Sequence, residues 1–132
     1  MAYQSFEDLE VWQRGCRLSV GIFETFAACK NFTLKDQIQR SGLSIPSNIV
    51  EGSERGSMKD FAHFLNIAKG SCGELRTQVY IARKLKLLSK SSFEQFVAET
   101  KEISKMLEGL RRSILAKSRA KQKRARRKAL KA

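Results

Sequence analysis

The chain has 132 residues, 42 % of them hydrophobic and 30 % charged, a length that fits one domain with a modest hydrophobic core. No apolar run approaches the roughly 20 residues that a membrane-spanning helix needs. The N-terminus MAYQSFEDLE is acidic, whereas a secretory signal peptide is basic and then apolar. We therefore expect a soluble cytoplasmic protein without a membrane partner.

The net charge of +13 is concentrated near the C-terminus. Residues 1–110 hold 15 Lys/Arg and 13 Asp/Glu, whereas residues 111–132 hold 11 Lys/Arg and no acidic residue. The chain thus divides into a nearly neutral body and a strongly basic tail.

The cysteines give no sign of a disulfide framework or a metal site. Cys16, Cys29 and Cys72 are odd in number and widely spaced, and they form no C-x-x-C pair. A Cys/His zinc site would need all three of them together with His63, the only histidine. We expect neither a metal nor another cofactor.

The first amphipathic segment predicts a helix over about residues 5–29, with Glu10 and Arg14 as an i,i+4 ion pair. At 100° per residue, its expected core stripe is Leu9, Trp12, Cys16, Val20, Phe23 and Ala27.

The second predicted helix covers residues 33–53 and begins at a capping-box variant formed by Thr33 and Asp36. Its expected core stripe is Leu34, Ile38, Ile45 and Ile49. The stretch SIPSNIVEG places a proline inside this helix, and Gly42 lies four residues before that proline, where a local bend meets no side chain. We assign an architectural role to a structural motif made of Gly42, Pro46, Asn48, Glu51 and Arg55.

The third predicted helix covers residues 58–88, after a cap signature at Ser57 and Asp60. Its apolar seam, with alternating spacings of four and three, is Phe61, Leu65, Ala68, Cys72, Leu75, Val79 and Ala82. The fourth helix, over residues 92–116, has Ser91 and Ser92 as candidate caps. Its expected stripe is Phe93, Phe96, Thr100, Ile103, Leu107, Leu110 and Ile114.

Four amphipathic helices with short loops and no strand signal predict an all-α, up-down-up-down antiparallel four-helix bundle over residues 1–116. The first and third helices each carry a second apolar line that a lone bundle does not need. We interpret these lines as a homo-oligomer interface, although scattered surface hydrophobes are the plainer explanation. The interface residues are Val11, Leu18, Ile22, Ile67, Ile81, Leu85 and Leu88.

The sequence offers no set of catalytic residues. His63 falls on the exposed side of its helix, Cys16 and Cys72 fall on core seams, and Trp12 is interpreted as a core or interface aromatic rather than a base-stacking platform. Neither glycine-rich stretch has the spacing of a phosphate-binding loop. We therefore expect a protein that is not an enzyme.

The basic tail, residues 117–132, predicts nucleic-acid binding. Like charges should keep it disordered when free, and phosphates should allow it to extend the fourth helix. Flexible RNA suits such a segment better than sequence-specific duplex recognition, because no helix-turn-helix or zinc finger is present. An anionic membrane is disfavoured because the tail lacks Trp and Phe, and a solvated solubility tail remains the alternative. The predicted binding residues are Arg111, Arg112, Lys117, Arg119, Lys121, Lys123, Arg124, Arg126, Arg127, Lys128 and Lys131, with a secondary basic surface at Arg14, Arg17, Arg83, Lys84 and Lys86.

Three motifs in order carry a family resemblance: FEDLEVWQ (6–13), SIPSNIVEG (44–52) and FAHFLNIAKGSCGELRTQ (61–78). They resemble a bacterial four-helix-bundle family that includes proteins encoded by intervening sequences in 23S rRNA genes. It also includes the accessory variability determinant of diversity-generating retroelements. The resemblance covers about residues 5–112 and leaves the tail outside.

This resemblance implies a non-enzymatic homopentamer, with the retroelement members binding nucleic acid and a reverse transcriptase. Basic tails suit a protein that must hold both template RNA and polymerase, so we favour the reverse-transcriptase partner. The alternatives are a ribosomal-RNA intervening-sequence protein and a protein–protein scaffold with an incidental tail.

Overall fold

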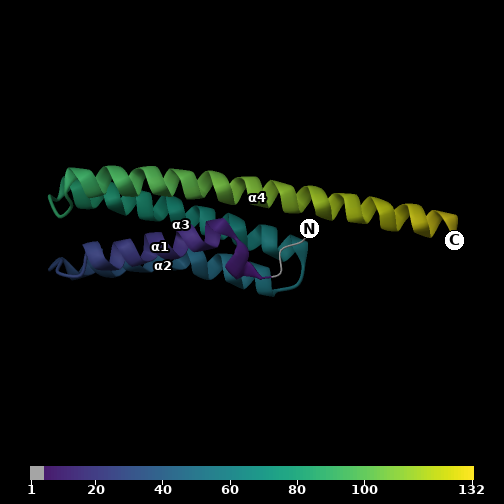
Figure 1. The fold of residues 1–132 in the computed structure, drawn as a ribbon, viewed down its shortest axis with the longest axis horizontal. Coiled ribbons are helices and arrows are strands. Elements are labelled where there is room, and N and C mark those ends of the chain that lie inside the picture. Colours follow the sequence, from purple (N-terminus) through teal and green to yellow (C-terminus); the bar gives the residue numbers. More distant parts are fainter. Residues whose placement is uncertain (1–4) are drawn as a thin grey trace.

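The computed structural model describes residues 5–132 and shows an all-α protein. A short 3-10 helix, η1 (Phe6–Asp8), precedes α1 (Glu10–Thr25), α2 (Phe32–Glu54), α3 (Met58–Lys84) and α4 (Lys90–Lys131). Consecutive helices run antiparallel, and α4 continues far beyond the other three (Figure 1). The expected four-helix bundle is confirmed. Within the described part of the chain, no helix is both long and apolar enough to cross a membrane.

The core lies where α2 packs on α3 and α3 packs on α4, while contacts between α1 and α4 are sparse. The stripe expected for α2 is buried along its whole length, as is the seam expected for α3. In α4 the expected stripe is also inside, with Phe93 and Leu110 partly buried at its margins. The buried hydroxyl of Thr100 donates to the carbonyl of Phe96 at 2.8 Å, so this polar residue lies in the core without an unpaired donor.

Of the predicted inner face of the first helix, Leu9 and Trp12 pack against the core, and the remaining positions were wrong. Val20 and Phe23, which we expected in the core, are 57 % and 42 % exposed. The line assigned to an oligomer interface, Val11, Leu18 and Ile22, is instead buried inside the protomer.

Small residues on this line explain the error. A Cβ on Gly15 would lie 3.4 Å from Ile45 and 3.6 Å from Pro46, so the absence of a side chain lets α1 approach α2 closely. Ser19 is buried on the same side. Glycine and serine interrupt the hydrophobic signal while favouring close packing, so the other face appeared more apolar in the sequence.

The helix ends differ from the predictions in ways that capping explains. Asn31 caps α2 by accepting from the backbone N–H of Leu34, and Ser89 caps α4 by accepting from Ser92. The predicted cap of α3 by Ser57 is confirmed.

Helix α3 ends four residues earlier than predicted. Lys86 has φ 60°, the backbone N–H of Leu87 donates to Ala82 at 2.9 Å, and that of Lys86 donates to Arg83 at 3.0 Å. These are the bonds of a Schellman motif, in which glycine usually occupies the left-handed position. Because lysine occupies it here, the sequence carries no clear stop signal. Leu88, beyond this end, is buried and is therefore not an interface residue.

The SIPSNIVEG stretch lies within α2, and Pro46 is buried inside a continuous helix as expected. The side-chain amide of Asn48 donates to the carbonyl of Ser44 at 2.8 Å. Glu51 and Arg55 form the expected ion pair at 2.9 Å, and the Arg55 guanidinium lies 4.9 Å from the centre of the Phe64 ring. These contacts support an architectural role for the motif.

Candidate nucleic-acid interface

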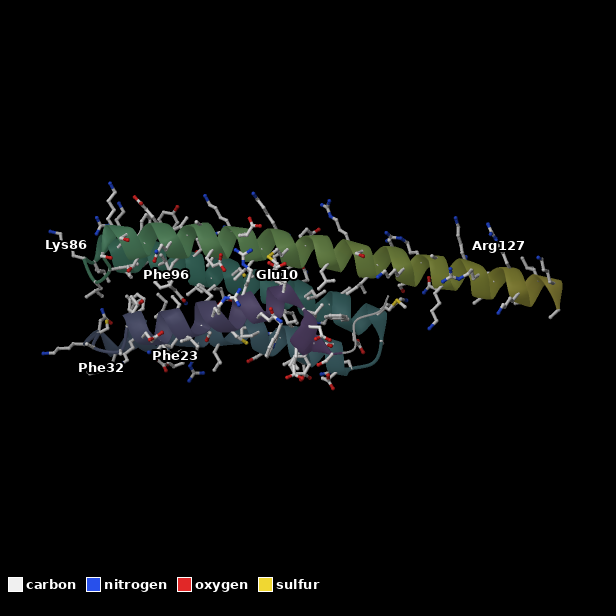
Figure 2. The ribbon with its side chains drawn as sticks, in the orientation of Figure 1. Glu10, Phe23, Phe32, Lys86, Phe96 and Arg127 are labelled. Atoms are coloured by element: carbon white, nitrogen blue, oxygen red, sulfur yellow. The ribbon has the colours of Figure 1, made fainter. Side chains whose placement is uncertain are left out.

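The basic extension, which we define as residues 117–131, forms the last part of α4 and projects beyond the bundle (Figure 1). All of its lysines and arginines are exposed. The side chains radiate around the helix, as the labelled Arg127 illustrates (Figure 2). The predicted binding residues from Lys117 onward therefore lie together on one exposed helical segment.

The helical state of this extension differs from the expectation that it is disordered when free. Alanine, lysine, arginine and glutamine, which make up most of it, are good helix formers. It also continues a helix whose first half is fixed by packing, so no new helix nucleus is required. Lys128 and Lys131 lie in the last turn, where positive charge is favourable to the helix dipole.

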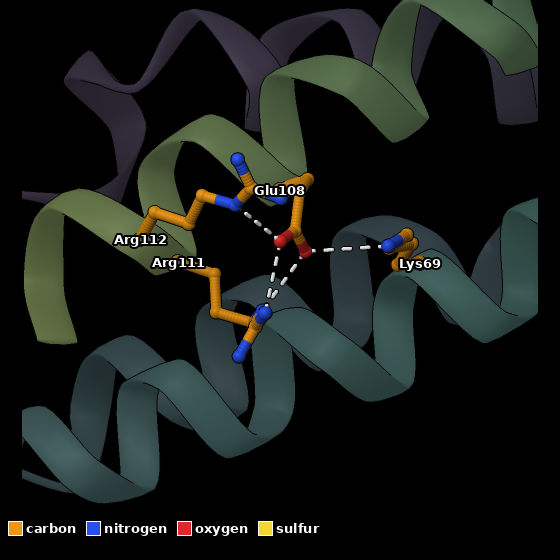
Figure 3. Close-up of polar contacts among 4 residues, drawn as sticks. All are labelled: Lys69, Glu108, Arg111 and Arg112. Carbon is orange, nitrogen blue, oxygen red and sulfur yellow. Dashed lines mark hydrogen bonds and ion pairs between the residues drawn. The ribbon is translucent and has the colours of Figure 1, made fainter.

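Arg111 and Arg112 both form ion pairs with Glu108 (Figure 3), and Arg112 remains exposed while it does so. The Nε of Arg111 donates to Oε1 of Glu108 at 2.9 Å, and the Nε of Arg112 donates to Oε2 at 2.8 Å. Lys69 of α3 reaches the same carboxylate at 3.2 Å. One acidic side chain thus gathers three cations and joins α3 to α4.

These contacts also determine the protonation of the cluster. The hydrogen bonds from Arg111, and next those from Arg112, hold the pKa of Glu108 well below its usual range, while the Glu108 carboxylate raises the pKa of Arg111. With a lowered folded-state pKa, Glu108 stabilises the fold above its ordinary pKa, and this contribution is lost as the pH falls through the lowered value. The Glu108 carboxylate is therefore ionised at neutral pH.

A basic groove between α3 and α4 was missed by the sequence analysis. It has a volume of about 480 Å³, and the charged residues that line it are Lys69, Arg76, Lys101, Lys105, Glu108 and Arg112. The signal that could have revealed it is periodic: Lys69 and Arg76 are seven residues apart, as are Lys105 and Arg112. In the near-neutral body, acidic residues on other faces masked this local excess of positive charge.

The secondary basic surface is only partly available. Arg14 of α1 donates through Nε to Oε2 of Glu99 at 3.1 Å, and this bond to Glu99 is the main reason that its pKa is raised. Arg14 therefore joins α1 to α4 instead of forming the predicted pair with Glu10. Arg83 donates to the carbonyl of Leu88 at 3.0 Å. Arg17, Lys84 and Lys86 are exposed.

Of the predicted interface residues, Ile67, Ile81 and Leu85 of the α3 line are 39 %, 45 % and 53 % exposed. On α1 the exposed apolar residues are Val20 and Phe23 instead of the predicted set. Both helices therefore carry exposed apolar side chains in the protomer. On α1 these are Val20 and Phe23, which we had predicted to lie in the core.

Cys72 and His63 occupy the expected kinds of environment, whereas Cys16 lies outside the core in which we had placed it. Cys72 is buried in the core, and burial raises the pKa of its thiol to about 12, which keeps it protonated. Cys16 is half-buried, and burial raises its pKa as well. His63 is exposed and packs edge-on against Phe64. Residues 5–132 contain no group of three or more His, Cys, Asp or Glu side chains placed to hold a metal ion.

These features define a four-helix bundle with a basic helical extension and a basic groove on its α3–α4 face. The family of 23S rRNA-intervening sequence proteins matches residues 7–109, and the chain belongs to this family. No curated protein matches the chain. Among solved structures, it is similar to a protein of unknown function of the S23 ribosomal protein family from Bacteroides thetaiotaomicron VPI-5482. The two are 27 % identical with a TM-score of 0.71, over 76 % of this chain and 96 % of that one. The basic extension lies outside the family match.

Proposed function

We propose that this chain is a non-enzymatic, oligomeric accessory protein that binds RNA through its basic extension. The observation that carries the proposal is an exposed helix with nine Lys/Arg and no acidic residue over residues 117–131. Such a helix gains affinity by releasing the counterions of a phosphate backbone, which requires no reading of bases. Without a base-reading motif, flexible RNA is the partner that this surface fits best.

Assembly of several protomers would multiply this weak, non-specific contact. The exposed apolar residues on α1 and α3 support a homo-oligomer, and the family resemblance supports a pentamer. Several extensions on one assembly would bind a single RNA with avidity, because each further contact becomes intramolecular. This arrangement suits a cytoplasmic partner of a retroelement reverse transcriptase, which must keep template RNA close to the polymerase.

The family name favours a second role, in which the protein is encoded within a 23S rRNA gene and acts with ribosomal RNA. The position of the gene separates the two roles. A neighbouring reverse-transcriptase gene supports the retroelement role, and a location inside a ribosomal RNA gene supports the other.

The proposal is tested by RNA affinity over a salt series for the full chain and for a truncation after Ala116. Removal of nine cations should weaken binding strongly and flatten the log–log salt dependence by several units, since each single-strand phosphate contact contributes about 0.7. A full-length control with Lys121, Lys123, Arg124, Arg126, Arg127 and Lys128 changed to Gln keeps a helix-forming extension but removes six charges. It should lose most of the affinity as well.

If the truncated protein bound RNA as tightly as the full chain, with the same salt slope, the extension would not be the binding element. If neither form bound RNA in a salt-dependent way, a scaffold that recruits a protein partner would replace the proposal.

A further inference from the structure

The basic groove and the basic extension share one edge of α4. Basic residues recur along this helix at spacings of four, seven, seven, four and three residues. They are Lys101, Lys105, Arg112, Arg119, Lys123 and Arg126. Spacings of three, four and seven keep side chains on one side of an α-helix. At 1.5 Å per residue the line is about 38 Å long.

Two hollows lie along this line. The first is the basic groove of the body, where Lys69 and Arg76 of α3 lie across from the basic residues of α4. The second, of about 470 Å³, lies on the extension and is lined by Arg119, Lys123 and Arg126 among others. Because the seven-residue step from Arg112 to Arg119 stays on the same side of the helix, the two hollows follow one another in a single direction.

We infer that this line is one continuous track for the backbone of a single RNA strand, entering on the bundle and leaving along the extension. The inference rests on the proposed function and deepens it. It places part of the binding site on the four-helix bundle, and it specifies that the bound RNA is single-stranded.

The straightness of the track favours a single strand. The phosphates of a duplex wind about its axis once every 34–36 Å or so. A straight line of lysines and arginines of comparable length can therefore contact the backbone of either strand only at intervals. A flexible single strand can follow the line throughout, as in the basic channels that bind single-stranded nucleic acid. The groove also lies between two packed helices, where one backbone can enter more readily than a duplex.

Glu108 lowers the net positive charge in the middle of the track. Its carboxylate accepts from Lys69, Arg111 and Arg112, and therefore occupies the position that a phosphate of the bound strand would otherwise take between those cations. Lys101 and Lys105, by contrast, have no ion-pair partner within residues 5–132. The unpaired lysines should bind phosphate directly, and the Glu108 cluster should limit the affinity of the central part.

The test compares two full-length double variants that remove the same charge. Lys101→Gln/Lys105→Gln changes the groove, and Lys30→Gln/Lys59→Gln changes two exposed lysines outside it. The probe is an oligouridylate of about 20 nucleotides, longer than the 4–16 nucleotides that single-strand modules typically cover, with a duplex of equal length as competitor. Loss of two contacts should lower the salt slope by about 1.4 and the affinity about 25-fold near 0.1 M salt, and the control should match the parent protein.

The outcomes separate this inference from the proposed function. Equal affinities for the two double variants, with tight salt-dependent binding by the parent, would overturn the track and leave the extension as the whole site. Absence of salt-dependent binding by the parent would overturn both. Stronger binding of the duplex than of the oligouridylate would overturn the single-strand assignment.

Glu108→Gln provides an independent arm, because it should raise rather than lower affinity. Release of Lys69, Arg111 and Arg112 should increase the salt slope by about 0.7 for each cation that gains a phosphate. Circular dichroism must first show that the variant is folded. A folded Glu108→Gln protein with the affinity and slope of the parent would contradict the role assigned to this carboxylate.

Discussion

At the scale of single residues, Gly52 marks a close approach of α2 to α3. A Cβ at this position would lie 2.6 Å from the Cβ of Phe64 and 3.2 Å from backbone atoms of Phe61. None of these atoms belongs to the flexible end of a side chain, so the helices themselves would have to move. Gly52 therefore belongs to the architectural motif, for which we had predicted only Gly42, Pro46, Asn48, Glu51 and Arg55.

We predict that Gly52→Ala lowers the free energy of unfolding by about 1–3 kcal/mol, the usual cost of overpacking a core contact. Gly70→Ala is the matched control, because a Cβ there meets nothing within 4 Å and α3 is helical at this position. It should raise the free energy of unfolding by about 0.5–1 kcal/mol. Urea denaturation of both variants measures the pair, and equal effects of the two substitutions would refute the close-approach argument.

The residues that could be predicted from sequence are those whose burial follows a single unbroken period. On α3, the alternating spacings from Phe61 to Ala82 predicted seven positions that are all buried, and missed only the small residues Ala62 and Ser71. On α1 two apolar lines competed, and Gly15 gave no hydrophobic signal even though its lack of a side chain decides which line faces α2. The ion pair of Glu108 with Lys69 was also not predictable, because it joins two helices. Local patterns predict elements well, but they do not report which faces meet.

At the scale of elements, α4 combines two parts with different sources of stability. Up to Ile114 its inner residues are buried against the bundle, whereas the basic extension has exposed side chains and depends on intrinsic propensity and on continuity with the packed part. Like charges around the extension oppose the helix. Phosphates that neutralise these charges should strengthen it, so RNA binding and helix stability are coupled.

We predict that Ala125→Pro unwinds the end of the extension without affecting the bundle. Proline in a helix interior costs about 3 kcal/mol, and no packing beyond this position compensates for the loss. Backbone chemical shifts should lose their helical values near and after residue 125 and keep them in the rest of α4. Ala125→Gln should leave both regions helical. Continued helical shifts to the C-terminus in the proline variant would mean that contacts absent from the protomer hold the extension.

At the scale of the whole molecule, the basic surface and the apolar surface lie on different sets of residues. The track follows α4 and the adjoining edge of α3, whereas the exposed apolar side chains include Ile81 and Leu85 near the end of α3 and Phe23 on α1. An assembly formed through the apolar residues would therefore leave the cations free for phosphate. Assembly and RNA binding should be separable by mutation.

We predict that Ile81→Gln/Leu85→Gln reduces the size of the assembly and leaves the protomer folded, because both side chains are about half exposed and outside the core. Leu43→Gln/Leu130→Gln removes two other exposed leucines, on α2 and at the end of α4, and should keep the parent mass. Light scattering during size-exclusion chromatography measures the mass, and circular dichroism measures the fold. Since avidity depends on the number of linked sites, the smaller species should also bind a long oligouridylate more weakly while its affinity for a short one is unchanged. A parent that elutes as a monomer at every concentration would remove the basis for avidity.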